Sequence, residues 1–255
     1  MSEQNSPGMA GLTPLLLLLI LASNVWIGVT VQQGFGGGSP TPSAPSAVVT
    51  PAPAAPGAAA PTPDANAQAA NVKKPSKDDY VKGDAKALVS IIQYSDFECP
   101  FCNRAHPTIQ QLLTDYKGKV NWIHRDYPLA FHQNARPAAI AAQCVGKLGG
   151  SEAFYKFADA AYTKVAADPT VLSAAKLPEL AKATGVNMAK WQTCFDAKET
   201  EARVDADMKE GTAAGVNGTP GFILYNNKTG KVKSIAGAQP AASFEAALTE
   251  LGVTK

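Results

Sequence analysis

The stretch Tyr94-Ser95-Asp96-Phe97-Glu98-Cys99-Pro100-Phe101-Cys102 lies where two patterns of hydrophobic spacing meet. Before it, the apolar and β-branched run from Ala87 to Tyr94 is typical of a buried strand. After it, large apolar residues recur at helical spacing between Ile109 and Tyr116. The sequence therefore predicts a strand that ends at a Cys-x-x-Cys motif, and a helix that begins there.

The two cysteines of this motif occupy positions suited to redox chemistry. Cys99 is expected at the helix N-terminus, where unpaired N–H groups and the helix dipole favour a thiolate. Cys102 lies one turn further on and can form a disulfide with Cys99. Pro100 fits the first turn, where its missing N–H has no cost. The motif predicts a catalytic dithiol, with Cys99 as the attacking sulfur, that exchanges electrons with other thiols.

The motif has two other interpretations, a zinc site and a structural disulfide. A zinc site usually needs four ligands, and here only His106 offers a third beside Cys99 and Cys102. A structural disulfide across so short a loop gains little entropy. We therefore expect neither a metal nor a cofactor, and a metal-binding module that uses these three residues remains the alternative from another functional class.

The N-terminal region contains an apolar run, Leu12–Val31, of 20 residues without a charge. This length suffices to cross a hydrocarbon core of about 30 Å as a helix. No clear Ala-x-Ala cleavage site follows, and no Lys or Arg precedes Lys73. Both features disfavour a cleaved signal peptide, so residues 1–33 are predicted to be a tail and an uncleaved single-pass membrane anchor.

Composition divides the rest of the chain. Residues 34–76 hold nine of the 19 prolines and almost no large apolar side chains, so we predict a Pro/Ala/Gly-rich disordered linker there. Residues 77–255 have the size of one domain. The net charge is +2, and acidic and basic residues are interspersed. The absence of a basic stripe with interleaved aromatic residues disfavours nucleic-acid binding.

The order of the predicted elements suggests the fold of this domain. A lead-in and turn at 78–83 precede a strand, a helix and a strand, which together form a βαβ unit with a parallel pair. Helices follow over about 134–214, and then come two strands and a helix. The predicted ranges of the last strands and helix are 221–225, 232–235 and 243–251. This order predicts an α/β, thioredoxin-like fold with an inserted helical subdomain.

Particular residues add a family resemblance to this fold. Cys99-Pro100-Phe101-Cys102 after a strand, Gly218-Thr219-Pro220 before the third strand, and the helical insertion resemble DsbA-type thiol-disulfide oxidoreductases of the thioredoxin superfamily. The segment Arg125–Leu129 and His132 also resemble the branch with a Ser-Asp-Phe-Glu-Cys-Pro-Phe-Cys stretch. The resemblance spans about 78–251.

The resemblance implies roles for residues outside the dithiol. Thr219-Pro220 is expected to be a cis peptide that faces the dithiol and lets the Thr219 backbone bind an extended client peptide; an ordinary trans proline is the alternative. Many family members carry a buried acid six residues before the first cysteine, where this chain has Gln93. An amide takes up no proton at neutral pH, so water or a neighbour such as Glu98 is expected to act instead.

The remaining cysteines and histidines receive structural assignments. Family members with cysteines placed like Cys144 and Cys194 often pair them, so we expect a structural disulfide, with two buried free thiols as the alternative. His124 is expected to be a packed or surface residue on a strand. His132, in a loop, is a candidate neighbour of the dithiol.

Together these observations predict a membrane-anchored thiol-disulfide oxidoreductase. Four cysteines, one pair suited to oxidative chemistry, fit an extracytoplasmic location. Its partners are expected to be client proteins with free thiols or disulfides and, by family analogy, a membrane quinone-linked oxidase that reoxidises it. An isomerase or a reductase of the same fold remains the alternative, and the lack of a recognisable dimerisation domain disfavours the isomerase.

Overall fold

The structure is a computed structural model that describes residues 63–255. The predicted membrane anchor at 12–31 and the first part of the predicted linker, 34–62, lie outside these residues. Within residues 63–255, every helix is too short or too polar to cross a membrane.

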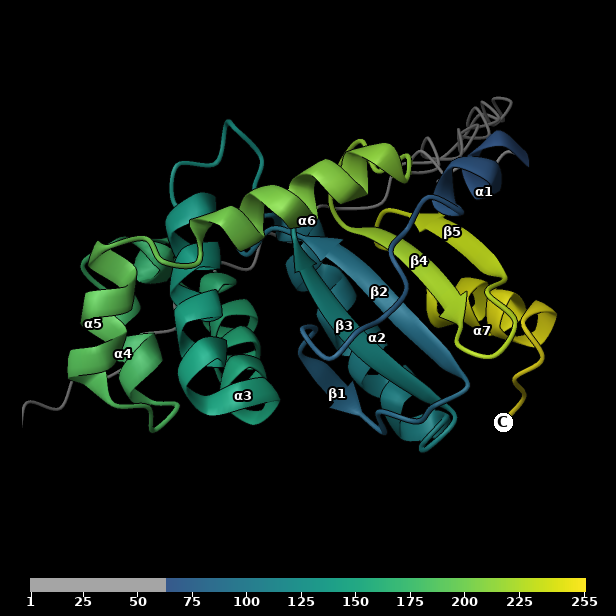
Figure 1. Cartoon of the computed structure of the whole chain (residues 1–255), viewed down its shortest axis with the longest axis horizontal. Coiled ribbons are helices and arrows are strands. Elements are labelled where there is room, and N and C mark those ends of the chain that lie inside the picture. The colour runs from purple at the N-terminus through teal and green to yellow at the C-terminus, as the bar shows by residue number, and fades with distance from the viewer. Residues whose placement is uncertain (1–62) are drawn as a thin grey trace, which may run out of the picture. The chain divides into compact units, whose positions relative to one another are not determined.

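A five-stranded mixed sheet forms the centre of the described domain, with the strand order β1-β3-β2-β4-β5 (Figure 1). The strands β2 and β3 run parallel, and the other neighbouring pairs run antiparallel. The strands are β1 (Val81–Gly83), β2 (Val89–Ser95), β3 (Val120–Asp126), β4 (Gly221–Asn226) and β5 (Val232–Ala236). The predicted βαβ unit and the later pair of strands are therefore confirmed, and the expected lead-in at 78–83 contains the short edge strand β1.

Helices cover both faces of this sheet and form a separate group beside it (Figure 1). The helices are α1 (Pro63–Ala69), α2 (Pro100–Asp115), α3 (Ala135–Val165), α4 (Leu177–Lys182), α5 (Met188–Asp196), α6 (Glu201–Ala213) and α7 (Ala241–Glu250), with a 3₁₀ turn, η1, at Pro169–Leu172. The predicted helical insertion over about 134–214 consists of the group formed by α3, η1, α4 and α5 together with α6. Helix α6 leads from this group back across the sheet to β4.

The alternation of side chains along β2 determines what lies on each face of the sheet. Ile91 packs with Ile109 of α2 in the larger hydrophobic cluster, which also contains α7 residues. Ile92 and Tyr94 point the other way, into a smaller cluster with Ala69 of α1 and its neighbours. Odd-numbered residues of β2 therefore face α2, and this places the last of them beneath the dithiol.

Helix α3 bends at Gly150, whose φ of 68° and ψ of −163° are not helical. A glycine tolerates positive φ because it has no Cβ. The sequence predicts two helices here, one from about Asn134 to Gly149 and one with an apolar face from Phe154 to Val165, and the bend separates those two segments. A disulfide joins α3 to α5 through Cys144 and Cys194, whose Cα atoms are 5.9 Å apart, so the predicted pairing is confirmed.

The predicted disordered linker is wrong for residues 63–76. Helix α1 packs on the domain, with Ala69 and Val72 buried. The Asn66 side chain accepts a hydrogen bond of 2.9 Å from Ser234 N at the edge strand β5, and Lys73 N donates to Glu210 at 3.0 Å. Ala69 packs through a small side chain, and the Asn66 side chain satisfies one N–H of the open edge of β5. A count of large apolar residues detects neither contact.

Candidate active site

The dithiol lies where β2 ends and α2 begins. Cys99 is the residue before the helix, with an extended backbone, and Pro100 is its first residue. Both sulfurs are reduced in this structure, and both residues are buried: Cys99 is 3% exposed and Cys102 is fully enclosed. The prediction that the motif joins a strand to a helix is therefore confirmed, and only Cys99 has a path to solvent.

The surroundings of Cys99 favour its thiolate. A hydrogen bond from the Cys102 thiol is the largest cause that lowers the pKa of Cys99, to about 5, and burial opposes it. The Thr219 side chain and the backbone N–H groups of Cys102 and Phe101 also act to lower the pKa of Cys99. At neutral pH, Cys99 is therefore the thiolate of the pair and its nucleophile.

Cys102 has the opposite character. Burial raises its pKa well above the ordinary value, and the hydrogen bond with Cys99 and the negative charge there raise it further. The Asp96 backbone N–H and the Ser95 hydroxyl act against this rise. Cys102 therefore keeps its proton at neutral pH while Cys99 is ionised.

The peptide bond between Thr219 and Pro220 is cis, as the resemblance implies. The Cys99 Sγ lies 3.4 Å from the backbone carbonyl oxygen of Thr219, to which the protonated thiol donates a hydrogen bond. The loop before β4 therefore lies directly against the attacking sulfur, which brings together two stretches 120 residues apart in sequence.

Two acidic residues of the motif fasten the neighbouring loop between β3 and α3. Asp96 accepts hydrogen bonds from Leu129 N at 2.9 Å and from His132 Nδ1 at 2.7 Å. Glu98 accepts from the backbone N–H of Asn134 at 2.7 Å and from its side chain at 3.2 Å. Both Glu98 oxygens thus serve the loop, and His132 lies beside the active-site turn.

The other two histidines are packed side chains. His124 is fully buried, stacks on Phe97, and has its Nε2 3.2 Å from an Asp126 oxygen. His106 Nε2 lies 3.2 Å from an oxygen of Asp159. Among residues 63–255, no group of three or more His, Cys, Asp or Glu side chains is arranged to hold a metal. The structure offers Cys99 and Cys102 no further metal ligand from the described part of the chain.

The structure contains a pair of hydroxyl groups beneath the dithiol that was not predicted from the sequence. Ser95, the last residue of β2, lies 2.6 Å through its oxygen from the phenol oxygen of Tyr162 on α3. The Gln93 amide donates to the same serine at 3.0 Å. Gln93 and Ser95 are polar residues at alternate positions of a buried strand, a pattern that indicates a buried polar cluster. Tyr162 lies on a distant helix, and the sequence does not show that the fold brings it to this strand.

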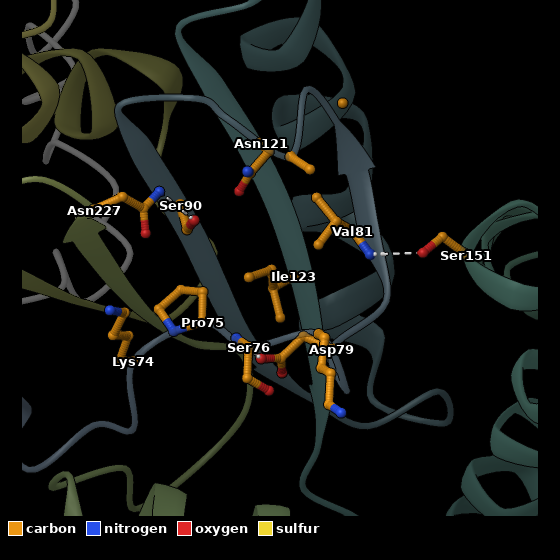
Figure 2. A pocket seen from close by; sticks show the side chains of 13 residues that line it. Lys74, Pro75, Ser76, Asp79, Val81, Ser90, Asn121, Ile123, Ser151 and Asn227 are labelled. Carbon is orange, nitrogen blue, oxygen red and sulfur yellow. Dashed lines mark hydrogen bonds between the residues drawn. The ribbon is translucent and has the colours of Figure 1, made fainter.

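A groove of about 560 Å³ lies over β1, β2 and β3 (Figure 2). Ser90 and Asn121, near the starts of β2 and β3, and the segment around Pro75 line it. It contains neither cysteine, and none of the residues assigned from the sequence lies in it.

The aromatic residues near the dithiol include two that are exposed. Phe101, between the two cysteines, is 51% exposed, and the Arg104 guanidinium lies 4.7 Å from its ring centre. Phe131, in the loop fastened by Asp96 and Glu98, is 76% exposed. Among the described residues these are the exposed large apolar side chains.

Comparison with a family model and with solved structures places this geometry among known proteins. The model described as Thioredoxin matches residues 75–247. Pseudomonas aeruginosa DsbA2 is 25% identical, with a TM-score of 0.57 over 70% of this chain and 96% of that one. Bacillus subtilis BdbD, in its oxidised form, is 22% identical, with a TM-score of 0.58 over 71% and 98%. The thiol-disulfide exchange protein α-DsbA2 of Wolbachia pipientis is 20% identical, with a TM-score of 0.62 over 74% and 98%.

Curated proteins with similar sequence are much longer than the matched region. A protein named Na(+)/H(+) antiporter NhaA 3, of Salinispora tropica, is 30% identical over 151 residues, which are 59% of this chain and 22% of that protein. NhaA 1 of Salinispora arenicola is 29% identical over the same shares. The chain spans less than a quarter of the length of these two relatives.

Proposed function

The chain belongs to the thioredoxin family as a DsbA-like thiol-disulfide oxidoreductase, and we propose that it forms or exchanges disulfides in client proteins through Cys99 and Cys102. The observation that carries this proposal is the asymmetry of the dithiol. One sulfur, Cys99, has a pKa lowered to about 5 and lies 3.4 Å from the Thr219 carbonyl. The other, Cys102, is enclosed with a raised pKa.

The proposed reaction begins with the oxidised dithiol. A client thiolate attacks the Cys99 sulfur, the Cys99–Cys102 bond breaks, and its electron pair stays on Cys102. A mixed disulfide between the client and Cys99 results. A second client thiolate attacks the client sulfur of that bond, and Cys99 leaves as a thiolate. The client gains a disulfide and the enzyme gains the two electrons.

The low pKa of Cys99 supports oxidation of clients as the direction. A stabilised thiolate stabilises the reduced enzyme relative to its disulfide, and this makes the disulfide a stronger oxidant. Thiolates with low pKa are also good leaving groups, so the mixed disulfide is resolved quickly. Isomerase or reductase activity is the competing possibility within the same chemistry.

Client binding is assigned to the loop that contains Thr219 and Pro220. The Thr219 carbonyl is within hydrogen-bonding distance of the attacking sulfur. A client in extended conformation that pairs with this backbone would present its own cysteine to Cys99, in the manner of an added strand. Side-chain identity then contributes little, which suits an enzyme that acts on many clients.

The cellular setting follows from the apolar run near the N-terminus and from the cysteines. We assign residues 12–31 to a single-pass membrane anchor, with the catalytic domain on the extracytoplasmic side and a quinone-linked membrane oxidase as the electron acceptor. The Cys144–Cys194 disulfide supports an oxidising compartment. Membrane fractionation and N-terminal sequencing of the mature protein test the anchor, and a mature N-terminus near Asn24 or beyond contradicts it.

The experiment for the reaction uses the oxidised full chain and a reduced, unfolded client that has disulfides in its native state. Loss of client thiols is measured together with recovery of the native client. Cys99→Ala should abolish both. Cys102→Ala, first converted to a mixed disulfide of Cys99 with a small thiol, should exchange that thiol for a client cysteine and so form mixed disulfides with the client.

His106→Gln separates this function from metal binding. It should leave the exchange reaction and mixed-disulfide formation intact, because His106 pairs with Asp159 rather than with the sulfurs. A wild-type protein that leaves client thiols unchanged but contains metal, and loses that metal in His106→Gln, would replace the oxidoreductase with the metal-binding module.

A further inference from the structure

Three buried neutral polar side chains meet beneath the dithiol, on the face of the sheet that α2 covers. The Ser95 oxygen lies 2.6 Å from the Tyr162 phenol oxygen and accepts a hydrogen bond of 3.0 Å from Gln93. All three residues are at most 1% exposed. Buried hydroxyl and amide groups are stable only when they are hydrogen-bonded, so this cluster holds its members in fixed positions.

The same serine is near enough to the buried sulfur to affect its pKa. Burial raises the pKa of Cys102, whereas hydrogen bonds from the Asp96 N–H and the Ser95 hydroxyl act to lower it. Asn103, the next residue of α2, donates through its side chain to the backbone carbonyl of Tyr162. Helix α3 is therefore held at the first turn of α2, the turn that contains Cys102, and Tyr162 is bonded to Ser95 there.

Counting hydrogens leaves this cluster two arrangements, of which one lets Ser95 donate to Cys102. A serine hydroxyl has one hydrogen and two lone pairs, and the Gln93 amide nitrogen, which only donates, occupies one lone pair. When Tyr162 donates to the other lone pair, the serine hydrogen is free to point at Cys102. In the reverse arrangement Ser95 donates its single hydrogen to Tyr162 and has none left for Cys102.

Neither partner of the serine ionises at neutral pH. Burial raises the pKa of Tyr162 well above its ordinary value, and the charge at Cys102 raises it further. Gln93 has no titratable proton. The cluster therefore offers permanent donors rather than a carboxylate, and permanent donors favour a negative charge on the sulfur they face.

We propose that Ser95, oriented by Tyr162 and Gln93, donates a hydrogen bond to the Cys102 thiolate at the moment the Cys99–Cys102 disulfide opens. Ser95 is then a catalytic residue, because it touches the leaving sulfur, and Tyr162 and Gln93 are positioning residues. This inference rests on the proposed oxidoreductase function. It assigns the site beside Cys102 to a neutral hydroxyl, where the sequence suggests a proton acceptor such as Glu98.

The step needs no additional reagent. The client thiolate forms a bond to Cys99 while the Cys99–Cys102 bond breaks, and the departing electron pair becomes the Cys102 thiolate. Ser95 stabilises that charge without giving up its proton. Protonation of Cys102 from solvent follows as a separate event, so atoms and charge balance at each stage.

The first test measures the Cys102 thiol alone. In the full chain with Cys99→Ala, the pKa of Cys102 is read from thiolate ultraviolet absorbance as pH rises. Adding Ser95→Ala should raise this pKa by about one to two units, the range expected for one hydrogen bond to a charged group. Adding Tyr162→Phe should raise it by a smaller amount, and Ser95→Thr, which keeps the hydroxyl, should restore it.

Tyr155→Phe is the matched control. Tyr155 is also a buried tyrosine of α3, but its hydroxyl lies between the backbone carbonyls of Tyr80 and Trp122, at 2.8 and 2.7 Å, rather than beside the dithiol. Its removal should leave the Cys102 pKa unchanged. In the oxidised wild-type background, Ser95→Ala should slow the opening of the disulfide by a small-molecule thiol about three- to tenfold, and Tyr155→Phe should not.

The outcomes are distinct. A Cys102 pKa that is equal in folded Ser95→Ala and in its parent overturns the proposal, and so does an equal shift in Tyr155→Phe. If Ser95→Ala does not fold, Tyr162→Phe carries the test, because it removes one oxygen from the far end of the pair. The pKa measurement needs neither a client nor turnover, so its result stands even if the protein acts on no client.

Discussion

His132 Nδ1 lies 2.7 Å from an Asp96 oxygen, which fastens the loop between β3 and α3 to the turn that leads into Cys99. The same oxygen accepts from Leu129 N at 2.9 Å, and the other oxygen accepts from Glu98 N at 2.7 Å. Asp96 also donates its own N–H to Cys102. One buried carboxylate thus sets the geometry of the turn, of the loop and of a donor to the enclosed sulfur.

His132→Ala should therefore loosen this turn. Removing one partner leaves a buried Asp96 oxygen short of a donor, which costs about 1–3 kcal/mol of the free energy of unfolding. Urea unfolding followed by circular dichroism measures the loss. His132→Asn is the control, since its amide nitrogen can take the place of Nδ1. Equal stability of His132→Ala and wild type would show that this contact does not hold the turn.

The Cys99 position and its chemistry could be predicted from the sequence, because they depend on local structure. A strand that ends at Cys-x-x-Cys places the first sulfur at a helix N-terminus whatever the rest of the fold is. The contact between Cys99 and Thr219 needed the family resemblance as well, since no local pattern brings these two residues together.

The cluster formed by Ser95, Tyr162 and Gln93 could not be predicted, for a tertiary reason. The inward direction of Gln93 and Ser95 follows from strand alternation, but Tyr162 belongs to a helix beyond the bend of α3. Residues 63–76 were missed for a different reason. They pack on the domain through a few buried side chains and hydrogen bonds. Such contacts leave no periodic pattern of apolar residues in the sequence.

Alkylation across pH should identify the nucleophile. Because a hydrogen bond from Cys102, with further donors, lowers the pKa of Cys99 to about 5, the reduced protein should be labelled at half its maximal rate near that pH. Peptide mapping should place the first label on Cys99 and none on Cys102 at neutral pH. Faster labelling of Cys102 would reverse the assigned roles.

Removal of the Cys144–Cys194 disulfide should destabilise the domain while the dithiol stays intact. The bond closes a loop of 50 residues, which in the chain-entropy model corresponds to about 4 kcal/mol of the free energy of unfolding. The double variant Cys144→Ala/Cys194→Ala should show this loss in urea. The rate at which its folded form oxidises a small thiol should match that of wild type. A loss of that rate without unfolding would link the helical insertion to catalysis.

Asp207 should make the stability of the domain fall as pH rises from about 4 to about 7. Burial, followed by the charge of Asp126, raises the pKa of Asp207 from 3.8 to about 7. The folded protein therefore keeps a proton in this window that the unfolded chain loses. The free energy of unfolding should fall by up to about 1.4 kcal/mol per pH unit.

Asp207→Asn, which retains an acceptor for Asp126 N, should flatten the decline, so that its stability relative to wild type grows toward pH 7. Asp205→Asn removes a charge from the exposed side of the same helix, where Asp205 pairs with Arg136, and should leave the slope near that of wild type. Denaturant unfolding at several pH values measures all three proteins, and parallel curves for wild type and Asp207→Asn would show that Asp207 is already ionised in the folded state.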